Sequence, residues 1–488
     1  MRDLFRDGLK LGESLARLPW KAARRMGGGR SETLTMAANL GERLGTLPFR
    51  AATAVLGADP KTEKSAPRPA ETEATRQPRA RVVVLGAGYA GISAFLELQD
   101  HLPREYDLVL VNGDKYHWFT TELHTYIAGE QPDAVRVPLS RIIARPGRLI
   151  VDKVKRVDIE SRRVELISGE AVGYDYLIVA LGSDPEYFGL PGVAENSLIV
   201  GNWQSATRLR ELIAAMLAES GDVVRHVAVA GGGLTGVEVA GELADEYGSR
   251  IRLTLIEAGP EIMAGFAPPL VRTAREVLEA KNIEIRTGNP IVRVDPNQIS
   301  FKDGSTLDFD LLVWSGGVRG SAILSESGLE VTPRGRARVD PYLRAAGHPE
   351  IYIVGDSAAF TDPATGRELP PTAQAAVQMG HTAGVNLLHH IRGKAEEPFA
   401  PHIRGSFASL GRQEGVGQMG EEQFVGMPAL LVKNMIEAHH AWETGGGVMP
   451  LVSRLLRAPQ RFLRGTKGPV AVRPRASAPP ARPEPRPH

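Results

Sequence analysis

Two glycine-rich segments with the same spacing are the residues of this chain best suited to chemistry. The first is Gly86-Ala87-Gly88-Tyr89-Ala90-Gly91 and the second is Gly231-Gly232-Gly233-Leu234-Thr235-Gly236. Such glycines permit a tight turn, let backbone N–H groups approach a pyrophosphate, and let a helix pack closely on a strand. One such segment is a weak signal, but two predict a protein that binds two dinucleotides. A flavin and a nicotinamide are the usual pair, and they indicate hydride transfer.

The end of the strand after each segment is the place for a side chain that binds the adenosine ribose. Asn112 holds this position after the first segment, where an amide can bond a ribose hydroxyl without charge; the alternative is a turn residue in a relic that binds nothing. Glu257 holds it after the second. A carboxylate accepts from the ribose hydroxyls and repels a 2′-phosphate, which favours NADH over NADPH. The alternative for Glu257 is a solvated glutamate at a strand end.

Two later segments add polar groups suited to a flavin. Asp356 follows a glycine at the end of the apolar run 351–354, and its oxygens suit a polyhydroxyl chain such as ribitol. Thr372 is a predicted N-cap, and the positive end of its helix would stabilise a reduced, anionic flavin. Gln374 and Gln378 lie one turn apart and would face the flavin ring or a second substrate, or else solvent.

Glu238 is the candidate acid beside the nicotinamide. We expect it in the first turn of the helix that follows the second glycine segment, where the helix dipole favours a carboxylate. It would accept hydrogen bonds from the nicotinamide ribose or amide, or it is simply an N-terminal helix charge. We treat Glu242, one turn further on, as structural.

The elements that must position these residues alternate between strand and helix. Apolar runs at 108–111, 177–180, 253–256, 311–314 and 351–354 are separated by helical patterns, which predicts parallel sheets with crossover helices. The fold class is therefore α/β, with two Rossmann-like dinucleotide-binding domains, an N-terminal helical extension and a C-terminal amphipathic region. A helix is predicted near Ala429–Trp442.

Composition narrows the class of protein further. The chain has 488 residues, a net charge of +1 and no cysteine. This charge gives no case for nucleic-acid binding, and the missing thiols exclude disulfide reductase and cysteine-dependent sulfide:quinone reductase chemistry. We predict no bound metal. No apolar run approaches the roughly 20 residues that span a bilayer, and the first residues lack the apolar core of a secretory signal.

Both ends of the chain carry amphipathic patterns. The sequence around 11–23 recurs around 40–52, with leucines on one helical face and charged residues on the other. The segment Leu451–Arg464 sets arginines against apolar residues, with Pro459 interrupting it. Such segments are typical of attachment to an anionic membrane. The alternative is that they pack on this chain's own domains or on a partner copy.

Taken together, these motifs resemble the bacterial type II NADH:quinone oxidoreductases over about residues 80–445. The more specific ones are 313–321, which contains Trp-x-x-Gly-Val-Arg-Gly, and 372–378, which contains Ala-Gln-x-x-x-Gln. The segments that complete the resemblance are 86–91, Tyr116-His117, Glu122-Leu123-His124, 180–182, 235–243 and 355–360.

The resemblance implies non-covalent FAD, NADH as substrate, and a hydride passed through the flavin to a quinone without proton pumping. The implied catalytic residues are Glu238 and Gln374, and the implied quinone residues are Gln374 and Gln378. The implied FAD-binding residues are Gly86, Gly88, Tyr89, Ala90, Gly91, Asn112, Gly113, Val154, Gly182, Asp356, Ala373, Gln374 and Lys433. The implied NADH-binding residues are Gly231, Gly233, Gly236, Glu238, Glu257 and Gly317.

The resemblance also implies a respiratory homodimer attached to the cytoplasmic face of the cell membrane by amphipathic helices. Two other functions stay open: an NAD(P)H-dependent reductase of a ferredoxin- or rubredoxin-type carrier, and a non-catalytic flavoprotein scaffold anchored by its N-terminal repeat. The predicted division is a helical extension 1–56, a disordered linker 57–80, an FAD domain in two parts (81–200 and 319–395) around an NADH domain 201–318, a C-terminal domain 396–467 and a disordered tail 468–488.

Overall fold

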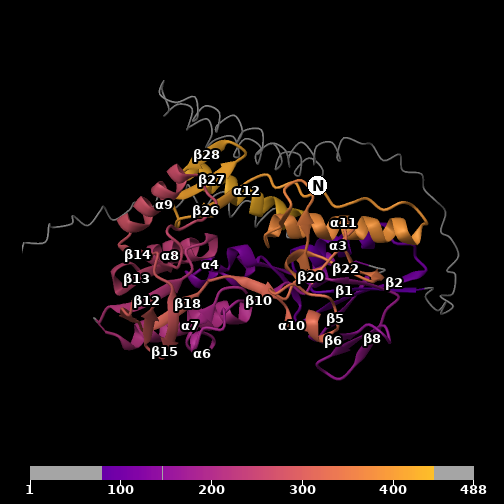
Figure 1. Cartoon of the computed structure of the whole chain (residues 1–488), viewed down its shortest axis with the longest axis horizontal. Coiled ribbons are helices and arrows are strands. Elements are labelled where there is room, and N and C mark those ends of the chain that lie inside the picture. The colour runs from indigo at the N-terminus through magenta and orange to yellow at the C-terminus, as the bar shows by residue number, and fades with distance from the viewer. Residues whose placement is uncertain (1–79, 145–146, 222, 445–488) are drawn as a thin grey trace, which may run out of the picture.

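The computed structural model describes residues 80–144, 147–221 and 223–444. The predicted N-terminal repeat, almost all of the linker, the segment Leu451–Arg464 and the tail lie outside these residues. Two mainly parallel sheets stand side by side, with the second sheet at the left and the first at the right of Figure 1. The predicted α/β class with two Rossmann-type domains is confirmed.

The first sheet contains the first strand of the described chain. Its order is β21 (Arg344–Ala345), β22 (His348–Ile353), β9 (Tyr176–Val179), β1 (Ala80–Leu85), β2 (Tyr106–Asn112) and β5 (Gly147–Val151). All neighbours are parallel except β21 and β22. The central strands are buried on both faces, which is why they are continuous apolar runs without alternation. Helices α3 (Tyr89–His101) and α11 (Ala373–Ile391) lie together on one side (Figure 1).

The second sheet repeats this design with its own core. Its order is β11 (Leu198–Ile199), β18 (Leu311–Trp314), β12 (Arg225–Ala230), β13 (Ile251–Glu257) and β14 (Ile283–Thr287), all parallel. Helices α7 (Trp203–Glu219), α8 (Leu234–Tyr247) and α9 (Pro268–Ala280) contribute to the core on one side. The small sheet β15 (Ile291–Asp295), β16 (Gln298–Phe301) and β17 (Thr306–Asp308) contributes to a separate apolar cluster against it.

A third unit follows the second part of the first sheet. Strands β26 (Ser406–Ser409), β27 (Gly415–Met419) and β28 (Glu422–Val425) form an antiparallel sheet against α12 (Met427–Glu443). Figure 1 places α12 and this sheet at the top, between the two parallel sheets. Helix α12 contains the predicted segment Ala429–Trp442.

Shorter elements connect these units. Outside the three sheets lie β3 (Tyr116–Trp118) with β4 (Arg136–Pro138), β6 (Val154–Asp158) with β7 (Arg163–Leu166) and β8 (Ala171–Gly173), β10 (Ser183–Pro185) with β19 (Val318–Gly320), β20 (Ala337–Arg338) with β23 (Ala358–Ala359), and β24 (Thr361–Asp362) with β25 (Arg367–Glu368). The short helices are η1 (Thr120–Glu122), α4 (Leu123–Ile127), η2 (Pro132–Ala134), α5 (Leu139–Ile142), α6 (Val193–Asn196), η3 (Gly248–Arg250), α10 (Ala322–Glu326) and η4 (Gly355–Ser357). Across the described ranges no helix is both long and apolar enough to cross a bilayer.

Candidate functional site

The first glycine segment forms the turn between β1 and α3. Gly86 has φ +94°, and its N–H donates to the carbonyl of Val111 at 2.8 Å. A Cβ on Gly91 would overlap the Gly86 carbonyl oxygen, whereas a Cβ on Gly88 would meet none of the described atoms within 4 Å. The turn is therefore closed behind and open at Gly88, the N-cap of α3. An open helix N-terminus without a capping side chain suits a pyrophosphate.

Asn112, at the end of β2, holds this turn in place. Its Oδ1 accepts from the N–H of Ala87 at 2.9 Å. Its Nδ2 donates to the carbonyl of Asp114 at 3.0 Å and lies 3.5 Å from that of Tyr116. The position therefore needs an acceptor and a donor on one side chain, which an amide has and a carboxylate lacks. Beside it, a Cβ on Gly113 would lie 3.2 Å from Cγ of Lys153.

The second glycine segment repeats the turn between β12 and α8. Gly231 has φ +109°, and its N–H donates to the carbonyl of Ile256 at 2.8 Å. A Cβ on Gly236 would overlap the Gly231 carbonyl oxygen, while one on Gly233 would find no atom of the described chain within 4 Å. Glu257 braces this turn with both carboxylate oxygens, which accept from the N–H groups of Gly232 and Gly259 at 2.7 Å each.

The Asp356 side chain lies on the first sheet at the end of β22. Its Oδ2 accepts from Ser183 Oγ at 2.9 Å, and the backbone is turned by Gly355, with φ +67°. Burial raises the pKa of the Asp356 carboxyl, while the Ser183 hydrogen bond and the Arg336 charge oppose that rise. The carbonyl of Gly182 accepts from Ser357 Oγ at 3.0 Å, which joins the end of β9 to the same turn.

Arg336 fixes this turn and was not found by sequence reasoning. Its buried guanidinium donates to the carbonyls of Asp356 (3.1 Å), Leu369 (3.0 Å) and Ala358. These three acceptors are backbone atoms more than 19 residues away, and the carboxylate that the guanidinium also binds, Glu368, lies 32 residues away, so no local motif marks the arginine in the sequence.

Thr372 caps α11 as predicted: its Oγ1 accepts from the N–H of Ala375 at 3.2 Å. Ala373 is the first residue of the helix. The two predicted glutamines bind one neighbouring segment of the chain. Gln374 Oε1 accepts from the N–H of Arg404 at 2.8 Å, and Gln378 pairs with both backbone groups of His402, at 2.9 and 3.1 Å.

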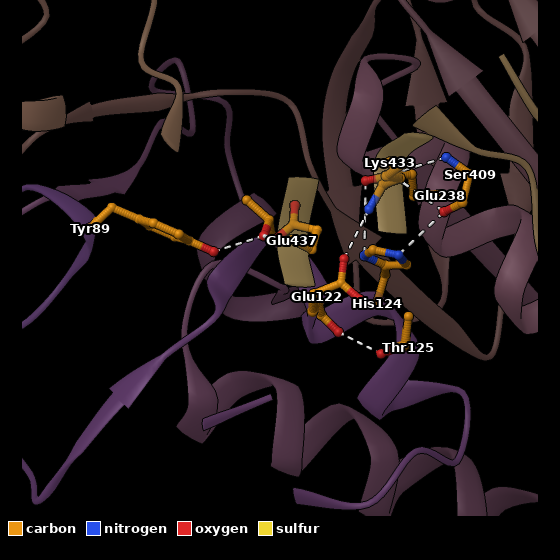
Figure 2. A network of polar contacts seen from close by, with 9 residues as sticks. Tyr89, Glu122, His124, Thr125, Glu238, Ser409, Lys433 and Glu437 are labelled. Atoms are coloured by element: carbon orange, nitrogen blue, oxygen red, sulfur yellow. Dashed lines mark hydrogen bonds and ion pairs between the residues drawn. The ribbon is translucent and has the colours of Figure 1, made fainter. Parts of the chain in front are cut away.

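Glu238 lies elsewhere on its helix than the sequence predicted. Helix α8 begins at Leu234, inside the glycine segment, so Glu238 is its fifth residue and lies in the second turn. The expectation of a first-turn, dipole-stabilised carboxylate is therefore wrong. The side chain points instead into a buried polar cluster (Figure 2).

We define this buried polar cluster as Glu122, His124, Glu238, Ser409 and Lys433. Lys433 Nζ, from α12, lies 2.9 Å from Glu122 Oε1 and 3.4 Å from Glu238 Oε1. Ser409 donates its N–H to Glu238 Oε1 at 3.2 Å, and its Oγ lies 3.3 Å from His124 Nε2. His124 Nδ1 is 3.8 Å from Glu238 Oε2. These residues come from four segments of the chain that meet in this cluster.

Lys433 carries a firm positive charge in this cluster. Its burial would lower the pKa of the ammonium, but the carboxylates of Glu122, Glu238 and Glu437 raise that pKa above its ordinary value. A buried ammonium held between carboxylates suits a site where charge develops during a reaction. Glu122, His124 and Ser409 carry no signal of this role in the sequence, because their partners lie 171 or more residues away.

A second polar arrangement starts at the first glycine turn. The carbonyl of Ala87 can only accept, so His117 Nδ1 donates to it, at 2.7 Å. The neutral ring then accepts at Nε2 from His440 Nε2, at 3.3 Å. Burial lowers the pKa of His117 to about 4, against a rise from the Ala87 bond. The Tyr89 hydroxyl lies 2.7 Å from Thr121 Oγ1, which links this predicted flavin residue to α12 through Glu437 (Figure 2).

The remaining predicted residues lie along the same edges of the two sheets. Ala90 packs in α3, where its carbonyl lies against Gly380 of α11. Val154 is the first residue of β6, next to the loop that follows β5. Gly317, with φ +139°, follows β18 and lies beside the second glycine turn, because Ser315 Oγ donates to the carbonyls of Ala230 and Gly231. Among the described residues no group of three or more histidines and acids is placed to hold a metal.

Comparison with known proteins identifies the family of the chain. Residues 80–380 match the family described as pyridine nucleotide-disulphide oxidoreductase. Proteins named type II NADH:quinone oxidoreductase from Staphylococcus haemolyticus and Staphylococcus aureus are each 32% identical over 382 residues, which cover 74% of this chain and 94% of each relative.

Solved structures show the same fold. The structure titled NDH2 from Plasmodium falciparum in complex with NADH has a TM-score of 0.69 and 19% identity, and the match covers 79% of this chain and 98% of that one. The resemblance inferred from the motifs is thereby confirmed. The chain belongs to the type II NADH:quinone oxidoreductases within the pyridine nucleotide-disulphide oxidoreductase family, and it is an NADH-dependent flavin oxidoreductase.

Proposed function

We propose that this enzyme binds FAD without a covalent link, oxidises NADH, and passes two electrons to a quinone without pumping protons. One observation carries the proposal. Glu238, two residues beyond the nicotinamide glycine turn, is buried 3.4 Å from Lys433, a predicted flavin residue that also lies 2.9 Å from Glu122. The nicotinamide turn therefore leads into a charged cluster that contains Lys433, which we assign to the flavin.

FAD fits the residues of the first sheet. The open N-cap at Gly88 leaves room for a pyrophosphate, Asn112 stands at the ribose position, and Asp356 offers carboxylate oxygens for a ribityl chain. When bound, FAD would supply the redox chemistry, taking a hydride and giving up two electrons. The chain would orient the ligand, and the N-terminus of α11 at Thr372 would supply positive potential.

NADH fits the second turn in the same way. Gly233 is open for its pyrophosphate, and Glu257 presents a carboxylate to the adenosine ribose. Glu238 would hold the nicotinamide half by accepting hydrogen bonds. The fixed carboxylate at Glu257 would disfavour the additional phosphate of NADPH.

The quinone assignment draws on the names of the relatives, all of which are NADH:quinone oxidoreductases. Gln374 and Gln378 are the residues we assign to it, at the start of α11. Because such quinones dissolve in lipid, we also propose attachment to the cytoplasmic face of the membrane, and a homodimer as the assembly.

The test uses purified full-length protein under anaerobic conditions. We expect a yellow protein that NADH bleaches, that NADPH bleaches far more slowly, and that soluble quinone analogues restore. Liposomes carrying the enzyme should show no pH gradient during turnover. A protein that stays yellow with NADH, or colourless after reconstitution with FAD, would contradict the proposal.

A pair of variants tests the role of Glu238. Glu238→Gln should keep its flavin and lose at least about tenfold in NADH-dependent turnover, because a charge next to the reacting groups is gone. Glu242→Gln is the matched control: Glu242 is a buried glutamate one turn further along α8, 3.6 Å from Arg412. Folded Glu242→Gln should turn over normally. Equal turnover in wild type and Glu238→Gln would show that Glu238 has another role.

A further inference from the structure

Phe188 combines two properties that folding alone does not explain. Its side chain is 59% exposed, and its backbone has φ +54°, a region that aromatic residues rarely occupy. A large apolar side chain that stays exposed contributes little to the stability of the fold, and a positive φ costs free energy. Residues held in sparsely populated backbone conformations gather at functional sites.

The loop that carries Phe188 is fixed to the end of β18. The N–H of Phe188 donates to Glu186 Oε1 at 2.7 Å, and the N–H of Glu186 donates to the carbonyl of Gly317 at 3.0 Å. Trp314 Nε1 donates to the carbonyl of Glu186 at 2.9 Å. The preceding strand β10 pairs with β19, which follows Gly317. The position of Phe188 is therefore set by the second sheet.

The ring itself lies over Gly317. A Cβ built on Gly317 would be 3.7 Å from Phe188 Cζ, which is ordinary van der Waals contact. Two more apolar side chains with partial exposure border the same sheet edge: Val318 (38%) follows Gly317, and Leu234 (36%) lies within the second glycine segment. The apolar surface thus follows the segments that surround the nicotinamide dinucleotide turn.

The order of strands in the second sheet indicates which half of a bound dinucleotide would lie against this surface. The chain order reverses at β12, since β13 and β14 lie on one side of it and β18 on the other. Ligands of such sheets lie across the carboxyl ends of the strands at that switch point. Glu257 marks the adenosine side, at the end of β13, and Gly233 marks the pyrophosphate. The remaining half of the ligand extends toward β18 and Gly317.

We propose that the Phe188 ring forms part of the NADH site, where it covers the nicotinamide half of the dinucleotide beside Gly317. This inference deepens the proposed function and rests on it. The Phe188 ring presents an apolar face to the nicotinamide and excludes water from it. This favours a fixed orientation of the nicotinamide for hydride transfer. Phe188 is thus a binding and positioning residue for the NADH half-reaction.

The experiment measures binding separately from turnover. The probe is NAD⁺, titrated into the FAD-loaded full-length enzyme by isothermal titration calorimetry. Phe188→Ala should raise the Kd for NAD⁺ about tenfold, and Phe188→Tyr should keep it within about twofold. Phe188→Gly should also weaken binding about tenfold, although glycine adopts φ +54° without strain. The Phe188→Gly result separates loss of the ring from strain in the loop.

Ile167→Ala is the control, because Ile167 is as exposed (63%) and lies after β7, in the small sheet β6–β8. It should bind NAD⁺ like wild type. All Phe188 variants should keep their flavin absorbance and their KM for a quinone analogue. A wild-type Kd in both Phe188→Ala and Phe188→Gly, or an equal loss in Ile167→Ala, would overturn the role of Phe188 alone. Wild-type enzyme that binds no NAD⁺ would overturn the proposed function as well.

Discussion

The turn after β1 and the turn after β12 match closely in their backbones. Gly86 and Gly231 have φ of +94° and +109°, and each donates its N–H to the next strand at 2.8 Å. The helix N-caps that follow, Gly88 and Gly233, have φ of −74° and −72°. Closed behind and open in front, both turns have the shape that a pyrophosphate requires.

The side chains that brace the two turns differ. Asn112 accepts from one N–H and donates to backbone carbonyls, whereas Glu257 accepts from two N–H groups. The carbonyls beyond β2 require a donor, whereas the N–H groups of Gly232, after β12, and of Gly259, after β13, require acceptors. The type of residue at each ribose position is therefore already suited to its protein neighbours, before any ligand binds. The flavin side is neutral there and the nicotinamide side is charged.

The same glycine-to-alanine substitution in each turn should abolish the binding of a different dinucleotide, and this is the largest effect we expect. Gly91→Ala and Gly236→Ala each place a Cβ against the carbonyl oxygen of the first glycine of the turn. Because both clashing groups belong to the backbone, neither can move away easily, and each substitution should cost about 3 kcal/mol of local stability. Gly91→Ala should yield colourless protein. Gly236→Ala should stay yellow but resist bleaching by NADH.

The open glycines provide the matched control for that pair. Gly88→Ala and Gly233→Ala meet none of the described atoms, so the thermal unfolding midpoint of the apoprotein should change little. Ligand affinity should still fall, because the methyl group occupies space where the pyrophosphate approaches. An apoprotein destabilised as much by Gly88→Ala as by Gly91→Ala would refute the contrast between a closed and an open side.

Acid should weaken the flavin half more than the nicotinamide half. Burial lowers the pKa of His117 to about 4, so the folded protein keeps this ring neutral while the unfolded chain binds a proton below about 6.5. Its contribution to stability is complete above pH 6.5 and is lost as pH falls toward 4, by about 3 kcal/mol in total. Burial and the Arg252 charge also lower the pKa of His226 in the second sheet.

Flavin release and denaturant unfolding between pH 7.5 and 4.5 would measure this loss. His117→Asn should be less stable at pH 7 but should show a shallower dependence on pH than wild type. His226→Asn, the counterpart beside β13, should retain the acid release of flavin. If His117→Asn and wild type lost stability with the same slope, the acid sensitivity would have to come from other groups.

The sequence predicted the frame of the molecule well, because its signals are local. Both glycine segments, the parallel strands and the Thr372 cap depend on residues within a few positions of one another. The predicted position of Glu238 was wrong because the helix begins inside the glycine segment, at Leu234. The start of a helix is poorly marked in the sequence when its N-cap is a glycine.

The buried polar cluster could not be read from the sequence in the same way. Glu122, Glu238 and Lys433 are ordinary surface residues in isolation, and only the meeting of three distant segments buries and pairs them. Arg336 is hidden for a related reason, since backbone carbonyls are present at every position and carry no signal. Glu238 was singled out by its place in the helix after the second glycine segment, whereas Lys433 was suggested only by the resemblance to a family.

Exchanging the amide of Asn112 and the carboxylate of Glu257 for each other's chemistry tests whether each turn selects its own residue type. Asn112→Asp replaces a donor with a carboxylate oxygen 3.0 Å from the Asp114 carbonyl, and we expect a loss of about 2 kcal/mol. Glu257→Gln places an amide N–H against one of two backbone N–H donors, at a similar cost. Only Glu257→Gln should also narrow the preference for NADH over NADPH, because it removes the charge.

Steady-state KM values for NADH and NADPH, with unfolding midpoints for both variants, would test this exchange. Asn112→Asp should have the weaker hold on flavin, and this defect should lessen at acid pH as the new carboxyl takes up a proton. A variant Asn112→Asp that binds flavin as tightly as wild type at pH 7 would mean that the carbonyls beyond β2 do not select the amide.

The helix caps give the smallest contrast. Thr372 accepts from the N–H of Ala375 at 3.2 Å on the flavin side, and Asn202 accepts from the N–H of Ser205 at 2.9 Å at the start of α7. Replacing either with alanine should cost about 1 kcal/mol in chemical denaturation. Thr372→Ala should in addition shift the flavin reduction potential, since α11 would direct its dipole at the ligand, while Asn202→Ala should not. Equal potentials in both variants would indicate that the start of α11 stabilises the fold and has no influence on the cofactor.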